Sequence, residues 1–502
     1  MRRRQFLNAA AAAGLAGLLP NSVWGSTDWK DRFEQALADK PWLAGYAHAS
    51  KDSYAAEATV QGRWPEGLTG TLYRNGPAGH EVGGYRYHHW FDGDGLLQAY
   101  RFGPRGVTHQ AKFIATYKRQ SEQKAGRPLY STFATGVEAQ APVTSPDTLN
   151  PANISVLHHH DTLLALWEAG SPWEMDPATL ETRGVYAFSD HTRGVPFSAH
   201  PRVDADGTLW NFGYLSMANL LLLWHIDKSG RLVKIDKIKA DPITMVHDFV
   251  VTERHLVLLI APFHYDNPGA DNFLASHTWH GNDPTRVLVI DKNDFSQQQW
   301  FELPAQWVFH FGNAWEDSAG VIRFDAARAE DPLAMIDSFT AIMRGEVLPA
   351  SPSLHHQYRI NTKAGKIAEM PMFSPTFESE FPSVDPRVST RRNNRLVMLS
   401  RDTRTEAPHN NLNAVTGFSY ATGLRDTWRY PDTQLPEEHL YVPQHDRAPE
   451  TGGWVVGSAL DWRQRKQVLN VFDAEHISHG PVASATLPYA LPLGLHGTFV
   501  AG

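Results

Sequence analysis

The chain has 502 residues, of which 42% are hydrophobic and 20% charged, a composition typical of a folded globular protein. A net charge of -8, with no basic block after the first residues, argues against nucleic acid as a partner. The absence of cysteine excludes disulfides, thiolate metal sites, iron–sulfur clusters and a cysteine nucleophile. Histidine, in contrast, occurs 25 times.

The N-terminal residues have the pattern of an export signal. They read MRRRQFLNAAAAAGLAGLLPNSVWGS, a basic start followed by a mildly apolar run that is too short for a stable membrane span. The segment RRQFL (3–7) resembles a twin-arginine signal, and small residues precede a cleavage point near Ser26. We predict a signal peptide over residues 1–25, one domain over 26–502 and a periplasmic protein exported in its folded state. A plain secretory signal is the alternative.

Beyond this segment the pattern changes from helix to strand. Residues 27–43 (TDWKDRFEQALADKPWL) predict a helix with Thr27 as its N-cap. Short apolar and aromatic runs then alternate with Gly, Pro, Asp and Asn, and runs ending in a polar turn recur roughly every 50 to 70 residues. No Gly/Ser or Pro linker divides them. We therefore predict an all-β fold, a single β-propeller.

Two segments need separate interpretation. The four leucines at 220–223 could form a membrane-touching patch, but inside a blade strand they more commonly belong to the core. Residues 331–349 are more helical than their surroundings, and we predict an insertion on one face of the propeller.

Four histidines differ from the others by their surroundings. Each follows a short apolar stretch and precedes a turn or polar break: His200 in FSAHPRVD, His247 in TMVHDFVVTE, His310 in VFHFGNAWED and His496 in LPLGLHGTFV. Such positions are strand ends that would meet at a propeller axis. A propeller closes by placing its last strand beside its first, so even His496, flanked by glycines that permit a tight turn, could reach the centre. Spacing alone leaves a structural role open for each.

The remaining histidines are interpreted as structural. Adjacent strand side chains point to opposite faces, so His158, His159 and His160 cannot bind one metal together. The same interpretation applies to the pair His355–His356 and to the loop residues His277 and His280.

Several sequence segments in order point to a known family. They are RNGP (74–77), HHWFDGDG (88–95), ANISVLHHHDTLLALWEAGSPWEMDPATLETRG (152–184), AHPRVD, VHDF, FHFGNAWED, EFPSVDPR (380–387), EHLYVP (438–443) and GLHGTFV. Together, from about Gly70 to the end, the chain resembles the carotenoid cleavage oxygenase family. The resemblance implies a seven-bladed propeller with a cap of helical and loop insertions, holding one Fe²⁺ by His200, His247, His310 and His496.

The resemblance also implies three glutamates behind the ligands: Glu168 in ALWEAG, Glu380 in EFPSVDPR and Glu438 in EHLYVP. A metal-bound imidazole donates its second N–H to such a carboxylate, which fixes the tautomer and the ring orientation. Glu437 is the alternative to Glu438. The chain departs from the family where ANIS stands for the common ANTN, because Ile154 then replaces a threonine near an open iron position.

The implied reaction is oxidative cleavage of a conjugated C=C bond by O₂ into two carbonyl products. The sequence has no GxGxxG motif opening a helix, so no dinucleotide supplies electrons and the alkene must do so. Stilbene-cleaving relatives commonly use a Tyr and a Lys to hold a phenol. Those positions fall near His109 or Gln110 and near Thr148 or Leu149, and neither residue is found there.

We therefore predict a carotenoid or apocarotenoid substrate, with a stilbene or related phenylpropanoid as the alternative. A membrane-dwelling polyene makes peripheral membrane contact plausible, through insertions near Phe273 and Trp279 or near Phe339 and Ile342. Other rivals are a non-catalytic periplasmic binding propeller and a metallohydrolase or isomerase on the same scaffold. The oligomeric state stays open.

Overall fold

The computed structural model describes residues 24–104, 106–349, 351–404 and 407–502, and it consists mostly of antiparallel sheets. Seven sheets form the blades of a β-propeller, which confirms the predicted fold. The first blade contains the strands β1 (Ser53–Glu57), β8 (Gly106–Phe113), β7 (Asp94–Gly103), β3 (Gly70–Arg74) and β35 (Gly497–Ala501), with β4 (Pro77–Gly79) beside β7.

The next three blades follow in chain order as four-stranded meanders. The second contains β9 (Ser155–His159), β10 (Thr162–Leu166), β11 (Trp173–Met175) and β12 (Thr182–Val185). The third contains β13 (Arg202–Val203), β14 (Leu209–Leu215), β15 (Leu220–Ile226) and β16 (Leu232–Lys239). The fourth contains β17 (Val250–Val251), β18 (His255–Ile260), β21 (Thr285–Asp291) and β22 (Gln298–Leu303).

The last three blades complete the ring. The fifth contains β23 (Trp307–Glu316), β24 (Val321–Ala329), β25 (Ser353–Asn361) and β26 (Lys366–Pro371). The sixth contains β27 (Ser379–Ser383), β28 (Arg395–Ser400), β29 (Ala414–Ser419) and β30 (Arg425–Arg429). The seventh contains β31 (Gln434–Val442), β32 (Trp454–Asp461), β33 (Lys466–Asp473), β34 (Ala483–Thr486) and β2 (Thr59–Gly62).

Two strand pairs close the propeller by joining opposite ends of the chain. The C-terminal strand β35 pairs with β3 of the first blade, and the N-terminal strand β2 pairs with β34 of the seventh. The strand β35 is the innermost strand of the first blade, and β2 is the outermost strand of the seventh. Each blade is thus completed by a strand from the other end of the chain. The chain end after His496 is therefore fixed in a sheet, as the sequence analysis expected.

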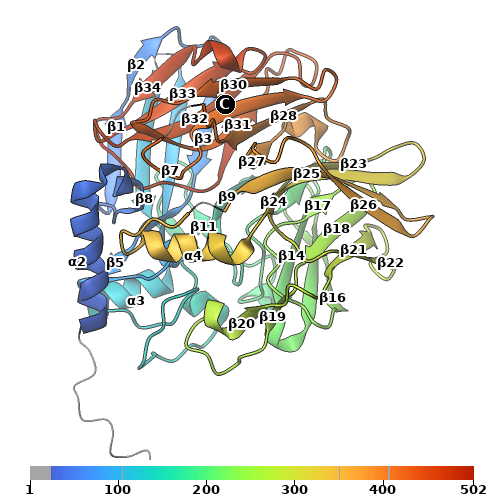
Figure 1. Cartoon of the computed structure of the whole chain (residues 1–502), viewed down its shortest axis with the longest axis horizontal. Coiled ribbons are helices and arrows are strands. Elements are labelled where there is room, and N and C mark those ends of the chain that lie inside the picture. Colours follow the sequence, from blue (N-terminus) through green and yellow to red (C-terminus); the bar gives the residue numbers. More distant parts are fainter. Residues whose placement is uncertain (1–23, 105, 350, 405–406) are drawn as a thin grey trace, which may run out of the picture.

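Helices and two-stranded hairpins lie outside the blade sheets. They are α2 (Trp24–Asp39), α3 (Tyr117–Ala125), α4 (Pro332–Ile342) and the hairpins β5 (Glu81–Val82) with β6 (Tyr85–Arg86) and β19 (Phe263–Tyr265) with β20 (His277–Trp279). In Figure 1, α2 lies along one edge and α4 crosses near the middle of the view. The helix α4 confirms the predicted insertion, and Asp331 caps it by accepting from the backbone N–H of Ala334.

The N-terminal helix differs in one respect from the prediction. It begins at Trp24, so Thr27 lies inside it and is not the N-cap. The twin-arginine segment and most of the predicted signal peptide lie outside the described residues. The division into a signal peptide and one domain over 26–502 stays a prediction.

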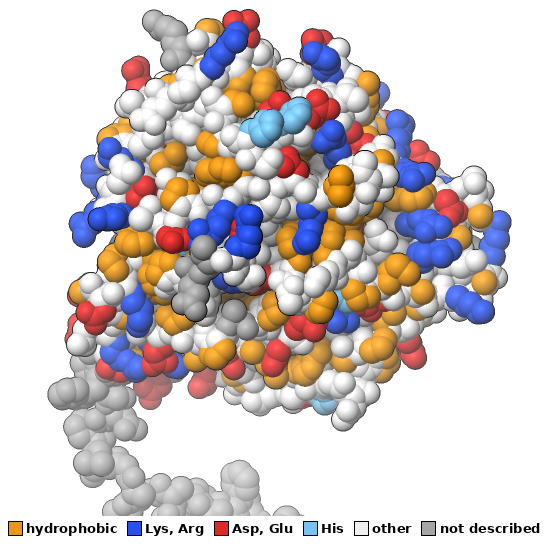
Figure 2. All heavy atoms as spheres, turned by 45° about the horizontal axis from the view of Figure 1, so that its top comes forward, with side chains coloured by type: hydrophobic (Ala, Val, Ile, Leu, Met, Phe, Trp, Pro, Cys, Tyr) orange, Lys and Arg blue, Asp and Glu red, His pale blue; other side chains and the backbone are white. Residues whose placement is uncertain are grey.

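The core is made by the apolar faces of neighbouring blades. Of the four leucines in β15, Leu221 and Leu223 are 0% exposed, so this segment belongs to the core and not to an outer patch. Trp224 in the same strand packs on Phe197 from the preceding connection. On the face drawn in Figure 2, acidic and basic side chains are interspersed with hydrophobic ones, several of which lie together in small groups. Within the described residues, no helix combines the length and apolarity that crossing a bilayer requires.

Candidate metal centre

Four histidines from four different blades meet at one point. All of them lie on, or within three residues before, an edge strand of their blade: His200 before β13, His247 before β17, His310 in β23 and His496 before β35. Their ligand atoms lie within 4.8 Å of one another. The Nε2 atoms of His200 and His247 are 3.0 Å apart, and those of His310 and His496 are 3.1 Å apart.

Three of the four imidazoles are held from behind by the predicted glutamates. The Nδ1 atom of His247 lies 3.2 Å from Glu168 Oε2, that of His310 lies 2.7 Å from Glu380 Oε2, and that of His496 lies 2.9 Å from Glu438 Oε1. Each glutamate has a further donor: Tyr214 Oη for Glu168, the Phe381 N–H for Glu380 and the Gly497 N–H for Glu438. The carboxylates are therefore fixed as well as the rings.

These hydrogen bonds determine which nitrogen faces the centre without a proton. A carboxylate only accepts, so the Nδ1 of each of these three histidines carries the hydrogen, and the neutral ring presents a lone pair on Nε2. The lone pairs of His310 and His496, whose Nε2 atoms face one another at 3.1 Å, repel unless a cation lies between them. The donor set thus fits a divalent transition metal with imidazole ligands.

Burial and the glutamates set the pKa values at the centre. Burial, followed by the neighbouring imidazoles, holds the pKa of His200 well below its usual value, and burial also lowers the pKa of His496. For His310, burial opposes protonation, but Glu380 outweighs it and raises the pKa. Although burial favours the neutral acid, His310 lowers the pKa of Glu380 and His496 that of Glu438, so both carboxylates stay ionised near neutral pH.

Close packing explains the glycines around His496. A Cβ added to Gly497 would lie 2.6 Å from the Tyr73 carbonyl oxygen, and one added to Gly494 would lie 2.9 Å from the Arg74 side chain. Both glycines are therefore required for the approach of the chain end to β3, and not for a left-handed turn. Glu437 points elsewhere, since its carboxylate accepts from Gln467 Nε2 at 2.7 Å.

A large cavity lies between the four histidines and the cap. Its volume is about 900 Å³, and its walls include His247, His310 and His496 together with Ile154, which is only 9% exposed. Five phenylalanines form much of the apolar wall and contact one another edge-on, tilted or stacked: Phe91, Phe133, Phe273, Phe309 and Phe339. The ring of Phe309 lies 5.0 Å from that of His247, so the aromatic wall reaches the metal centre.

The residues proposed for an apolar rim lie mainly inside this cavity. Phe273, Phe339 and Ile342 line its wall, and Trp279 lies on the core side with its ring 6.3 Å from that of Trp307. The insertions around these residues therefore form the cavity roof.

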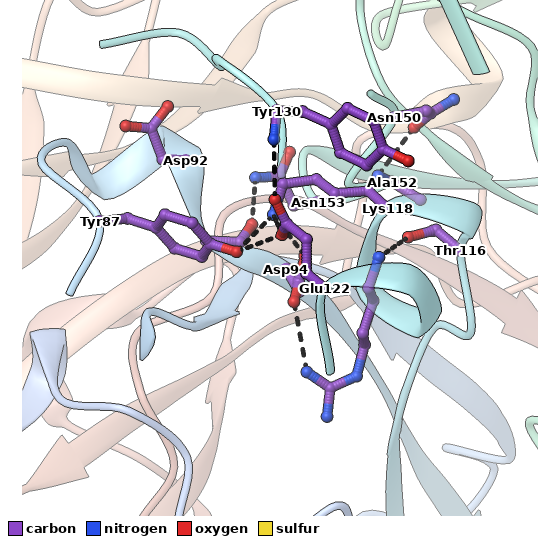
Figure 3. Close-up of polar contacts among 12 residues, drawn as sticks. Tyr87, Asp92, Asp94, Thr116, Lys118, Glu122, Tyr130, Asn150, Ala152 and Asn153 are labelled. Carbon is purple, nitrogen blue, oxygen red and sulfur yellow. Dashed lines mark hydrogen bonds and ion pairs between the residues drawn. The ribbon is translucent and has the colours of Figure 1, made fainter. Parts of the chain in front are cut away.

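A buried polar network fixes the roof to the first blade (Figure 3). The ammonium of Lys118, on α3, is 2.9 Å from Asp94, 3.0 Å from Glu122 and 2.9 Å from the hydroxyl of Tyr87. Nearby, Asp92 on the cavity wall accepts from the Thr135 hydroxyl at 2.7 Å. Together these contacts hold the segment around residue 133 over the histidines.

The sequence analysis did not identify Phe381 or Tyr214. Phe381 has a φ of +55°, a conformation uncommon for a bulky residue, and its ring stacks on His310 at 5.1 Å. Tyr214 donates to Glu168 at 2.9 Å. Phe381 follows Glu380 directly, so the motif EFPSVDPR could have indicated it. Tyr214 could not be found from local sequence, because it reaches Glu168 from another blade.

The histidines interpreted as structural make ordinary contacts. His159 Nε2 lies 2.9 Å from the Gly207 carbonyl, His355 Nε2 lies 2.7 Å from Asp325, and His356 Nδ1 lies 2.6 Å from Glu369. His277 lies 2.9 Å from the Phe273 carbonyl. His280 contacts Asp266 at 2.6 Å, in a cluster described below.

Comparison with known proteins identifies the family. Residues 46–501 match the family model described as retinal pigment epithelial membrane protein. The chain belongs to this family. It is 26% identical to the apocarotenoid-15,15'-oxygenase of Synechocystis sp., over 93% of this chain and 97% of that one. It is also 26% identical to resveratrol cleavage oxygenase 1 of Aspergillus fumigatus, over 92% of this chain and 96% of that one.

A solved structure gives the same result. Cobalt-substituted Synechocystis apocarotenoid oxygenase superposes with a TM-score of 0.82 at 26% identity, covering 92% of this chain and 99% of that chain. These findings confirm the resemblance predicted from the sequence. They support the assignment of this chain as an alkene-cleaving oxygenase.

Proposed function

We propose that the protein is a non-haem Fe²⁺ dioxygenase that uses O₂ to cleave a conjugated C=C bond of an apocarotenoid or carotenoid into two carbonyl products. The observation that carries the proposal is the convergence of four imidazole Nε2 atoms, three of them fixed by glutamates, at the end of an aromatic cavity. His200, His247, His310 and His496 would hold the iron, which when bound supplies activation of O₂.

Other side chains of the protein would fix the imidazole tautomers, align the polyene, exclude water and limit the room for O₂. Glu168, Glu380 and Glu438 keep the imidazoles in one tautomer. The phenylalanine wall aligns a flat polyene by its faces and excludes water, and Phe309 places it beside His247. Ile154 would stand near an open coordination position and limit the room for O₂.

The cavity lining favours a polyene over a phenolic stilbene. Among the described residues, no lysine lines it, so the cation that would stabilise a phenolate is lacking. His109 is 2% exposed and bonded to Tyr489, and Gln110 Nε2 donates to the Thr179 carbonyl. A volume of about 900 Å³ suits a long apolar molecule.

The test is the product analysis of the iron-loaded protein with an apocarotenal and, separately, resveratrol. We expect two carbonyl products from the apocarotenal, one O₂ consumed per cleavage, and a kcat/KM for resveratrol at least about tenfold lower, a difference of about 1.4 kcal/mol. Faster cleavage of resveratrol than of the apocarotenal would show that the substrate class is the stilbenes. Turnover without O₂ consumption would indicate an isomerase or hydrolase, and binding without turnover a non-catalytic propeller.

We further propose peripheral contact with membranes at the cavity entrance. Four exposed apolar side chains belong to the cavity lining: Val143, Met217, Val347 and Leu348, with Met217 78% exposed. Such side chains could collect a polyene directly from lipid. Cosedimentation with phospholipid vesicles should decrease for Met217→Ser combined with Leu348→Ser, while cleavage of a detergent-solubilised substrate continues. Equal sedimentation of both proteins would contradict this contact.

Export by the twin-arginine route stays a proposal based on the segment RRQFL (3–7). Cleavage before Ser26 would remove Trp24 and Gly25 from the start of α2 and leave the rest of the helix. Replacing Arg3 and Arg4 by lysine should retain the protein in the cytoplasm, as measured by fractionation. Unchanged periplasmic yield would favour a plain secretory signal.

A further inference from the structure

A second cluster of metal-ligand side chains lies on the hairpin that forms part of the cavity roof. It consists of His264 at the centre of β19, Asp266 just after that strand and His280 just after β20, with ligand atoms within 4.8 Å of one another. His280 Nε2 is 2.6 Å from Asp266 Oδ2. Asp283 approaches from the other side, 3.8 Å from the Nδ1 atoms of both His264 and His280.

The alternation of strand side chains explains how the cluster forms. Phe263 and Tyr265 on β19 point inward, since Phe263 packs on Trp307 at 5.3 Å and Tyr265 lines the cavity. His264 and Asp266 therefore share the outer face. His280 joins them because its backbone N–H donates to the Pro262 carbonyl at 2.8 Å, which sets the register of the two strands.

The rings of the two histidines are close and nearly parallel. Their centroids are 4.4 Å apart with an interplanar angle of 21°. The side chains are partly open to solvent, 20% exposed for His264 and 39% for His280, which leaves an entry path for an ion. Two imidazoles and the Asp266 carboxylate are ligand types suited to Zn²⁺, and Asp283 places a second negative charge nearby.

We propose that His264, Asp266 and His280, assisted by Asp283, form a second metal site that binds Zn²⁺ or a similar divalent transition metal. The bound ion would join β19 to the segment after β20. Because Tyr265 and His277 on the opposite face line the cavity, the ion would stiffen the cavity roof from outside. This proposal does not depend on the four-histidine centre or on the identity of the substrate.

The test uses the iron-loaded full chain dialysed against micromolar Zn²⁺, with zinc and iron measured together by mass spectrometry. The wild-type protein should retain about one zinc more per chain than the double variant His264→Gln/His280→Gln, with unchanged iron. The matched control is His476→Gln/His479→Gln, a stacked surface pair at 5.1 Å with one nearby aspartate, Asp473. The control should retain the additional zinc.

Two further measurements separate a site from surface adsorption. Zinc should slow hydrogen exchange in residues 263–280 of the wild type and of the control, but not of the double variant. His496→Ala should keep the outer zinc even if it loses iron. Equal zinc in the wild type and double variant, or equal loss in the control, would overturn the proposal and leave the cluster as a set of His–Asp ion pairs.

Discussion

The Nδ1 atom of His496 lies 2.9 Å from the carboxylate of Glu438, which precedes it by 58 positions in the chain. This contact joins the segment before the last strand, β35, to the first strand of the seventh blade, β31. The same carboxylate accepts from the backbone N–H of Gly497 at 2.7 Å. The C-terminal turn is therefore held by the glutamate that also orients the imidazole.

Glu438→Gln should weaken metal retention, because a neutral amide oxygen is a weaker acceptor for His496 Nδ1–H than a carboxylate, and the amide can instead turn its NH₂ group toward the ring. We expect a loss of about 10–100-fold in iron affinity or activity. Iron per chain after dialysis against a chelator measures it. Glu437→Gln is the matched control, since that carboxylate faces Gln467 and the Gly494 backbone. A larger effect at Glu437 would show that the assignment of the two positions is reversed.

Ile154→Thr restores the residue common in the family and enlarges the space beside the proposed open position. We expect the KM for O₂ to fall by roughly threefold to tenfold, or about 0.7–1.4 kcal/mol. Ile154→Phe, which fills the same space, should raise it. Oxygen-electrode kinetics at a saturating apocarotenal concentration give both values. An unchanged KM in both variants would remove Ile154 from the path of O₂.

The sequence was sufficient to predict the fold and the convergence of the four histidines. Both follow from the short motifs that the chain shares with the family and that occur in the same order. The three glutamates also lie where they were expected, each on its own imidazole. What was missed depends on contacts between distant segments. The register that brings His280 beside His264 and the packing of α3 on β7 leave no local pattern.

The misplaced features have physical reasons as well. Thr27 has the chemistry of an N-cap, but it lies inside the helix because Trp24, Gly25 and Ser26 are already helical. The insertions near Phe273 and Phe339 were candidates for an apolar rim, with packing on the propeller as the alternative, and these two rings pack on Phe133 and Phe91 in the cavity wall. An aromatic insertion in a sequence does not reveal which of its faces is covered.

Lys118→Met should destabilise the protein strongly. Lys118 is buried among Asp94, Glu122 and Tyr87, so its removal leaves Glu122 buried without its cation and Asp94 with Arg119 as its remaining partner, at a cost of about 3–5 kcal/mol. Lys112→Met, which removes a surface pair with Glu181, should cost less than about 1 kcal/mol. Chemical denaturation compares the two. Similar costs would mean that the network in Figure 3 contributes little to the stability of the first blade.

His109 predicts a pH dependence of stability. Burial lowers its pKa to about 3 from the model-compound value of 6.5, so the unfolded chain takes up a proton first as the pH falls. The contribution of the neutral ring is complete above pH 6.5 and is lost progressively toward pH 3. Between pH 7 and pH 5 the wild type should lose about 2 kcal/mol more than His109→Gln. Parallel pH profiles would contradict this, and His476→Gln should follow the wild type.

The central claim is that His200, His247, His310 and His496 form one iron centre. The most direct measurement is the metal content of the protein purified without added metal, beside that of His496→Ala. We predict about one iron per chain in the wild type and its loss in the variant. Zinc, copper or no metal in the wild type, or iron retained without His496, would contradict the account.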